Sequence, residues 1–212
     1  MGASCCTHTP VTSEPDMRYR HVLWVALILN VTMFLIEIVT GAHAESASLQ
    51  ADALDFLGDA GNYGISLFVV GMALRYRAKA AMAKGLTMGM VGLWVGGVTI
   101  WQALHGILPE AETMGIIGAL ALIANLLTFL ILWAYRSGDA NMRSVWLCSR
   151  NDMIGNVAVM LAALGVSGTE TGWPDVVVAG GMAALGLQTA WKIVRLSHTE
   201  LRRQASMRVI LP

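Results

Sequence analysis

The sequence predicts an all-α membrane protein, a polytopic bundle of six transmembrane helices. Of its 212 residues, 56% are hydrophobic and only 13% are charged, whereas ~25% are charged in an ordinary soluble domain. Most of the chain falls into apolar stretches of roughly 20 residues, the length needed to cross a hydrocarbon layer of ~30 Å. The 14 basic and 14 acidic residues cancel, which argues against a nucleic-acid-binding surface.

Short connections separate the predicted spans, so we expect one domain. The spans are residues 21–41, 48–74, 85–108, 113–135, 144–166 and 173–194. The third and fourth contain no Asp, Glu, Lys or Arg, whereas the other four carry internal charges. We expect an N-terminal tail over residues 1–19, the six-span domain over 20–195 and a short C-terminal tail over 196–212.

The basic residues predict the orientation in the membrane. Thirteen of the fourteen lie before the first span, in the connections after the second and fourth predicted spans, or from Lys192 at the end of the sixth span onward, and the other three connections contain none. By the positive-inside rule, both termini should face the cytoplasm. The exception, Arg150, lies inside the fifth span. By analogy with other compact six-span chains, we expect a bacterial inner membrane.

Acidic residues interrupt the second span. Asp52, Asp55 and Asp59 recur at steps of three and four residues, which places them on one face of a helix. A carboxylate inside a bilayer is costly and indicates a functional site. Three of them repel one another unless protons or cations neutralise them, so the pattern favours a cation pathway. The alternative is a static polar network with Arg150 and Asn side chains.

The fifth span offers a second pair of ligands. Cys148 and Asp152 are four residues apart, as are Asp55 and Asp59. Facing each other, the two pairs would supply one sulfur and three oxygens, a set that suits a tetrahedral divalent ion. Arg150 falls near the opposite helix face, where it would either extend to the membrane surface or pair with Glu37 in the first span.

These motifs resemble those of the cation diffusion facilitators, membrane exporters of divalent transition metals. The resemblance extends over about residues 20–195. It implies that Asp55, Asp59, Cys148 and Asp152 form the metal site for transport. The matching residues are Leu29, Asn30, Phe34, Glu37, Gly41, Ser46, residues 51–53, Asp55, Asp59 and the run from Asp152 to Asn156.

The sequence departs from the family pattern in three ways. Cys148 stands where His or Asp is common, the His-rich loop between spans four and five is missing, and no C-terminal metal-binding domain follows the spans. A thiolate favours Zn²⁺, Cd²⁺ or Co²⁺ over hard ions such as Mg²⁺. Without the C-terminal domain, a homodimer would have to form through transmembrane helices, and the small-residue spacing in the third span either serves that contact or packs within the monomer.

The excess of carboxylates predicts proton antiport. An empty site with four anionic ligands should take up protons, which an incoming metal would displace. Asp52 could belong to a relay or could simply start the second helix. Other positions that could relay protons or orient the ligands are Glu37, Asn62, Asn151 and Asn156.

The N-terminal tail contains a second group of candidate ligands, Cys5, Cys6 and His8. These side chains would capture soft metals on the cytoplasmic side, or they are incidental residues of a tail. The leading interpretation of the whole chain is a secondary active transporter rather than an enzyme, with no resident cofactor and with Zn²⁺, Cd²⁺ or Co²⁺ and H⁺ as its substrates. The alternatives are a non-transporting metal sensor or assembly partner of the same ancestry, and an intramembrane aspartyl protease.

Overall fold

The computed structural model describes residues 17–68, 74–133 and 140–210, and it gives residues 140–151 and 203–210 as helical backbone alone. The described residues contain helices and no strand, which confirms the all-α fold class. The helices are α1 (Met17–His43), α2 (Ala47–Phe68), α3 (Leu74–His105), α4 (Ala111–Leu132), α5 (Ala140–Thr169) and α6 (Trp173–Ile210).

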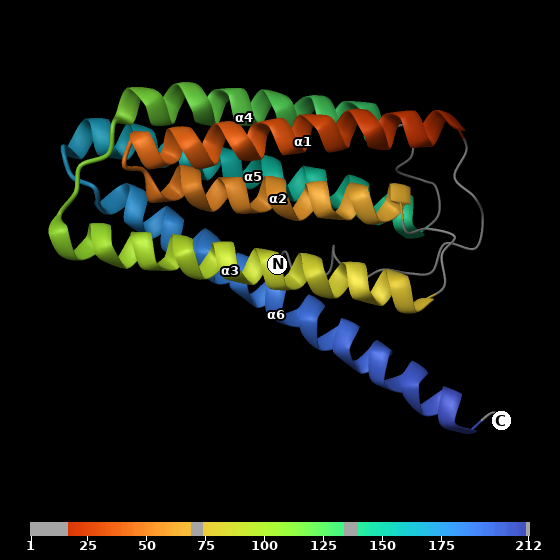
Figure 1. Ribbon diagram of the computed structural model, residues 1–212. Helices are drawn as coiled ribbons and strands as arrows, with labels where there is room; N and C mark the ends of the chain where they lie inside the picture. Colours follow the sequence, from red (N-terminus) through yellow and green to blue (C-terminus); the bar gives the residue numbers. More distant parts are fainter. Residues whose placement is uncertain (1–16, 69–73, 134–139, 211–212) are drawn as a thin grey trace.

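The helices lie side by side in a bundle, and α2 is at its centre (Figure 1). The most extensive packing is between α3 and α6, between α1 and α2, and between α4 and α5, while α2 contacts all five other helices. The C-terminal part of α6 diverges from the bundle. Because α2 is enclosed, its polar side chains lie in the interior of the bundle.

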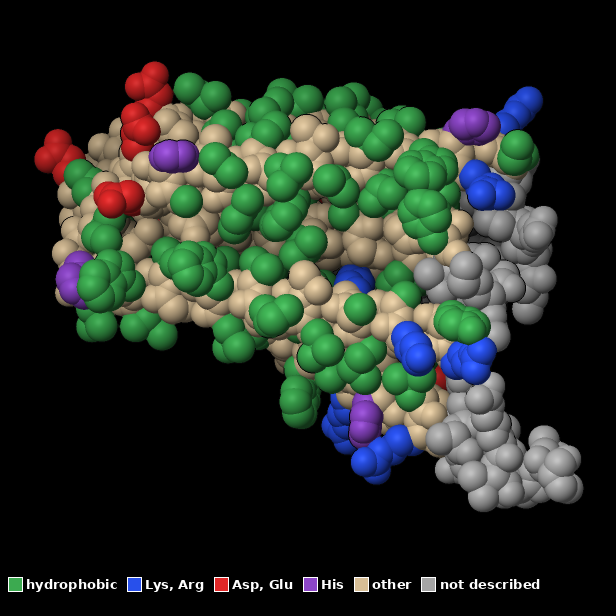
Figure 2. All heavy atoms as spheres, viewed as in Figure 1, with side chains coloured by type: hydrophobic (Ala, Val, Ile, Leu, Met, Phe, Trp, Pro, Cys, Tyr) green, Lys and Arg blue, Asp and Glu red, His purple; other side chains and the backbone are tan. Residues whose placement is uncertain are grey.

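The outer surface of the bundle is apolar. Large hydrophobic side chains such as Leu93, Trp94, Ile123 and Leu164 are exposed around it (Figure 2). Five helices in the described part of the chain are long and apolar enough to cross a membrane, and α2 is not among them. Its three Asp residues lower its hydropathy, but its 22 residues still span about 33 Å. The chain is an integral membrane protein whose polar helix is shielded by apolar ones.

The two ends of the bundle differ in charge. Acidic side chains gather at the end that holds the α1–α2, α3–α4 and α5–α6 connections, and basic side chains gather at the opposite end (Figure 2). The exposed acidic residues include Glu45, Glu110 and Glu170, and the exposed basic residues include Lys79 and Lys192. We call these the acidic end and the basic end. This asymmetry is the one on which the predicted orientation rests, and that orientation stays a prediction.

Three helix boundaries differ from the predicted spans by six residues or more. Helix α3 begins at Leu74 rather than residue 85, α6 continues to Ile210 rather than ending at 194, and α2 ends at Phe68 rather than 74. Hydropathy marks only the part of a helix inside the hydrocarbon layer. The extra turns of α3 and α6 are rich in Ala, Arg and Lys, which are good helix formers in water.

Tight turns close the acidic end. Glu45 follows α1 with φ of 51° and Glu170 follows α5 with φ of 52°, so both helices end on a left-handed residue. Gly172 comes two residues after Glu170, and a Cβ built there would lie 2.1 Å from the carbonyl oxygen of Ile107. Only glycine allows this approach between the α5–α6 turn and the residues that follow α3.

Candidate metal centre

The acidic stripe of α2 faces the interior of the bundle. Asp52 is 1% exposed and Asp59 is 7% exposed, while Asp55 between them is partly buried. Helix α2 contacts all five other helices, so most of its side chains, these carboxyls included, are enclosed by the bundle. The position of these carboxyls agrees with the spacing pattern in the sequence.

Asp59 meets Asp152 of α5. The two carboxyl groups lie within hydrogen-bonding reach of each other, and the hydroxyl of Tyr63 donates to Asp59 Oδ2 at 3.0 Å. Two carboxylates repel at this range, so a proton or another cation must be shared between them. The pair therefore joins the centres of α2 and α5 through a group that can hold a cation.

Gly155 leaves room for the other two Asp residues of the stripe. A Cβ placed on this residue of α5 would lie 3.6 Å from Asp52 Oδ1, 3.7 Å from Asp55 Oδ2 and 3.4 Å from the terminal methyl carbon of Met182 in α6. Two carboxylate oxygens and the end of a thioether side chain therefore surround the same bare stretch of α5. The absence of a side chain at position 155 leaves room for about one methyl group beside these carboxylates.

A second acidic pair lies beside the first. Glu37 of α1 is fully buried, and its carboxyl is adjacent to that of Asp52. Several deeply buried polar atoms lack a hydrogen-bond partner among the described residues: Asn30 Oδ1, both oxygens of Glu37, Asp52 Oδ2 and both amide atoms of Asn156. Buried polar atoms are normally paired, so this part of the interior is suited to protons, water or a cation.

Several predicted site residues lie outside the described part of the chain. This holds for the side chains of Cys148, Arg150 and Asn151, and for Cys5, Cys6 and His8 in the N-terminal tail. Among the described residues, no three acidic, His or Cys side chains converge closely enough to hold a metal ion. The structure brings Asp59 and Asp152 together, and the complete set of four ligands with Cys148 stays a prediction.

Residues 23–201 match the model of the cation efflux transmembrane domain. The chain belongs to the cation efflux family. The resemblance noted in the sequence is confirmed over nearly the whole region in which it was expected.

Curated relatives of this family have related names. The zinc transporter ZitB of Yersinia pestis is 26% identical over 209 residues, which cover 88% of this chain and 64% of that protein. The metal cation efflux system protein CzcD of Cupriavidus metallidurans is also 26% identical, with 93% and 64% covered. A cadmium, cobalt and zinc/H⁺–K⁺ antiporter of Bacillus subtilis is 23% identical, with 83% and 61% covered. The chain thus spans a little under two thirds of the length of these relatives.

Three residues near the acidic stripe of this cation efflux domain were not predicted from the sequence. Asp175 on α6 holds the start of α2, Tyr63 donates to Asp59, and Lys84 on α3 donates to Asn62 Oδ1. Tyr63 could have been found, because it follows Asp59 by four residues on the same helix. Asp175 and Lys84 act between helices, and the sequence carries no signal of which helices pair.

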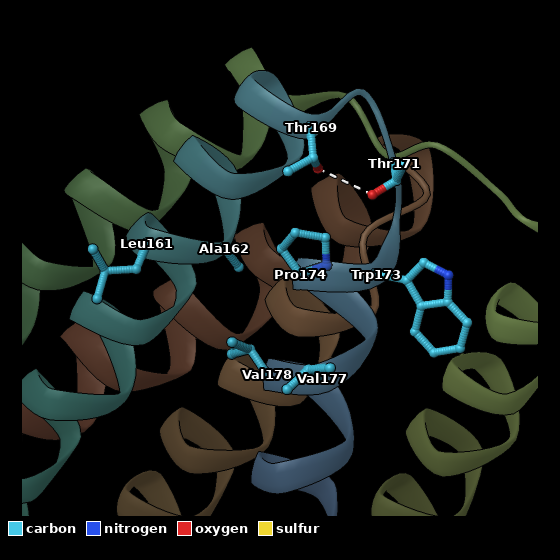
Figure 3. A pocket seen from close by; sticks show the side chains of 8 residues that line it. All are labelled: Leu161, Ala162, Thr169, Thr171, Trp173, Pro174, Val177 and Val178. Carbon is cyan, nitrogen blue, oxygen red and sulfur yellow. Dashed lines mark hydrogen bonds between the residues drawn. The ribbon is translucent and has the colours of Figure 1, made fainter.

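A groove between α5 and α6 lies apart from these carboxyls (Figure 3). Its volume is about 420 Å³, and its lining includes Leu161, Trp173, Pro174 and Val177. A hydrogen bond of 3.0 Å between the hydroxyls of Thr169 and Thr171 crosses its rim. Because no carboxylate lines the groove, it does not contribute to the candidate metal centre.

Proposed function

We propose that this chain exports divalent transition-metal ions from the cytoplasm across a bacterial inner membrane, in exchange for protons. Zn²⁺, Cd²⁺ and Co²⁺ are the proposed substrates. The observation that carries the proposal is the contact between Asp59 and Asp152 in the interior of the bundle. Membership of the cation efflux family and the metals named in its relatives support it.

The metal ligands in this proposal are Asp55, Asp59 and Asp152, with the thiolate of Cys148 as the fourth. Cys148 precedes Asp152 by one turn of α5, so both can serve the same face. A set of three carboxylate oxygens and one sulfur suits borderline ions in tetrahedral geometry. Convergence of all four would require Asp55 to move toward Asp59 and Asp152 when the metal binds.

Proton exchange follows from the charge of the site. Metal binding would displace the proton shared by Asp59 and Asp152, and protons arriving from the other side would release the metal after the helices rearrange. Glu37 and Asp52 would carry those protons, since both are buried and lie next to each other. Asn156 would orient them or hold water between them.

Metal uptake by everted membrane vesicles tests the transport proposal. Vesicles with the wild-type chain should accumulate Zn²⁺, Cd²⁺ or Co²⁺, offered one at a time. Asp59→Ala and Asp152→Ala should lower the rate at least tenfold, since even groups that only orient a metal ligand contribute about that much. Cys148→Ser should change the ranking of the metals. Glu112→Gln, which alters an exposed acid of α4, is the matched control.

The outcomes separate the parts of the proposal. No uptake of any metal by the wild-type chain would contradict transport and favour a sensor or an assembly partner. If the rate of uptake does not change with an imposed pH gradient at clamped voltage, proton exchange is contradicted but metal transport is not. An unchanged metal ranking in Cys148→Ser would remove the thiolate from the site.

The Asp59–Asp152 contact also meets the geometric requirement of an aspartyl protease, in which two carboxyls share a proton. The remaining carboxyls favour cation transport, because a protease needs only the pair, whereas Asp52 and Asp55 extend the acidic surface along α2. Cleavage of membrane substrates that stops in Asp59→Ala would favour the protease. Metal uptake without cleavage would favour the transporter.

A further inference from the structure

Lys84 brings a positive charge to the acidic stripe from another helix. It belongs to α3 and is partly buried, whereas Lys79 on the same helix and Lys192 on α6 are exposed. Its ammonium donates a hydrogen bond to Oδ1 of Asn62 on α2. The side chain therefore points into the bundle at the basic end rather than toward water.

A glycine on α2 makes room for this side chain. A Cβ added at Gly61 would lie 2.9 Å from Cδ and 3.0 Å from Cγ of Lys84. A Cβ at this position would therefore force the Lys84 side chain to shift. The aliphatic stem of Lys84 lies directly against the bare backbone of α2. Packing of this kind fixes the direction of the stem and holds the ammonium beside the helix.

The ammonium lies close enough to the candidate metal centre for its charge to act on a carboxylate there. Its partner Asn62 follows Asp59 by three residues, close to one helical turn, and the positive charge of Lys84 acts on the Asp59 carboxylate. Tyr63 donates to the same carboxylate at 3.0 Å. Asp59 therefore has the Tyr63 hydroxyl and the Lys84 charge on the side toward the basic end, and it has Asp152 of α5 as a further neighbour.

A fixed positive charge beside a metal ligand has a definite consequence. It stabilises the carboxylate when no metal is bound, and it repels a dication that approaches the same carboxylate. We propose that Lys84 is a built-in counter-cation near Asp59, so that its charge repels an incoming divalent ion, which binds less tightly than the carboxylates alone would allow. Weaker binding would favour release of the ion on the far side.

This inference rests on the proposed function, and its test is metal binding by the purified full-length chain at fixed pH. Zn²⁺ and Cd²⁺ are titrated against a competing fluorescent chelator. Lys84→Met keeps the stem but removes the charge and should tighten binding about tenfold, while Lys84→Arg keeps the charge and should stay within about twofold of wild type. Lys79→Met makes the same change at an exposed position of α3 and should have no effect.

Transport kinetics and a second variant strengthen the test. In vesicles, Lys84→Met should lower both KM and kcat, because a tighter ground-state complex is released more slowly. Gly61→Ala keeps the charge but displaces the stem, so it should also tighten binding. It serves as the deciding variant if Lys84→Met does not fold.

The direction of the change separates this role from a structural one, since damage to the site weakens binding. Unchanged or weaker binding in Lys84→Met with a wild-type melting temperature would overturn the inference. If Gly61→Ala decides, unchanged or weaker binding there would do the same. Absence of binding by the wild-type chain would instead contradict the proposed function.

Discussion

The carboxylate of Asp175 on α6 accepts a hydrogen bond of 2.8 Å from the backbone N–H of Ala47, the first residue of α2. Asp175 is fully buried, and it also accepts from the hydroxyls of Ser46 and Ser48 and from the backbone N–H of Ser48. A helix normally caps itself with a residue just before its start. Ser46 does so here, because its hydroxyl oxygen accepts from the backbone N–H of Leu49 at 3.2 Å. Asp175, 128 positions away from Ala47, adds a second cap, and its negative charge lies at the favourable end of the helix dipole.

Asp175→Ala should therefore destabilise the protein. The substitution leaves buried donors at the start of α2 without an acceptor, and we expect the free energy of unfolding to fall by about 3 kcal/mol. Asp175→Asn retains one acceptor oxygen and should lose about half as much. Thermal unfolding in detergent measures both, with Glu112→Gln as the control at an exposed acid. Equal melting temperatures for Asp175→Ala and wild type would show that α2 does not depend on this cap.

Gly172→Ala should also destabilise the protein, for a steric reason. Its new methyl group would overlap the carbonyl oxygen of Ile107, which lies 2.1 Å from the Cβ position, and relief of such overlap costs about 1–3 kcal/mol. Gly168→Ala is the matched control, because no atom lies within 4 Å of its Cβ position. Since it lies in the last turn of α5, alanine there should leave stability unchanged or raise it slightly. A comparison of the two melting temperatures decides the matter, and identical values would contradict the predicted clash.

Gly155→Ala should separate stability from metal binding. Its methyl group would make ordinary contacts of 3.4–3.7 Å with Met182, Asp52 and Asp55, and alanine favours a helix over glycine by about 1 kcal/mol. Stability should stay constant or rise. Zn²⁺ binding should weaken several-fold, because the methyl group fills the space beside the two carboxylates.

The control for this variant is Gly115→Ala in α4, which has no neighbour within 4 Å of the added Cβ. It tests the general effect of alanine in a membrane helix. If Gly155→Ala binds Zn²⁺ as tightly as Gly115→Ala, the space beside Asp52 and Asp55 is not part of the metal centre.

The sequence was sufficient to predict the helices and the inward face of α2. Both follow from local rules, since hydropathy marks the apolar stretches and a repeat of three and four residues places Asp52, Asp55 and Asp59 together. The same rules placed Asp152 near that stripe only by assuming that α2 and α5 face each other. The structure confirms that these two helices pack together and that Asp59 meets Asp152.

Contacts between distant helices could not be predicted. Lys84 was counted only as one of the basic residues that set the orientation, yet it turns into the bundle because Gly61 leaves room for it. Asp175 was one charge near the start of the sixth span, yet it caps α2. Both roles depend on which faces of α2 meet α3 and α6, and a single sequence does not contain that information.

Glu37→Gln should abolish the response of transport to pH while leaving the fold intact. Glu37 is fully buried, and neither of its oxygens has a hydrogen-bond partner among the described residues. A neutral amide of the same shape removes the repulsion with Asp52, so stability should be unchanged or higher. Because glutamine cannot take up and release a proton, the rate of metal uptake should no longer rise with an imposed pH gradient. The measurement is Zn²⁺ flux in vesicles at two gradients, with Glu112→Gln as the control.

In the double variant of Glu37→Gln with Asp52→Asn, the two effects should not add, since both would interrupt one proton path. A Glu37→Gln variant that responds to the gradient like wild type would remove Glu37 from that path and restrict the exchange to Asp59 and Asp152.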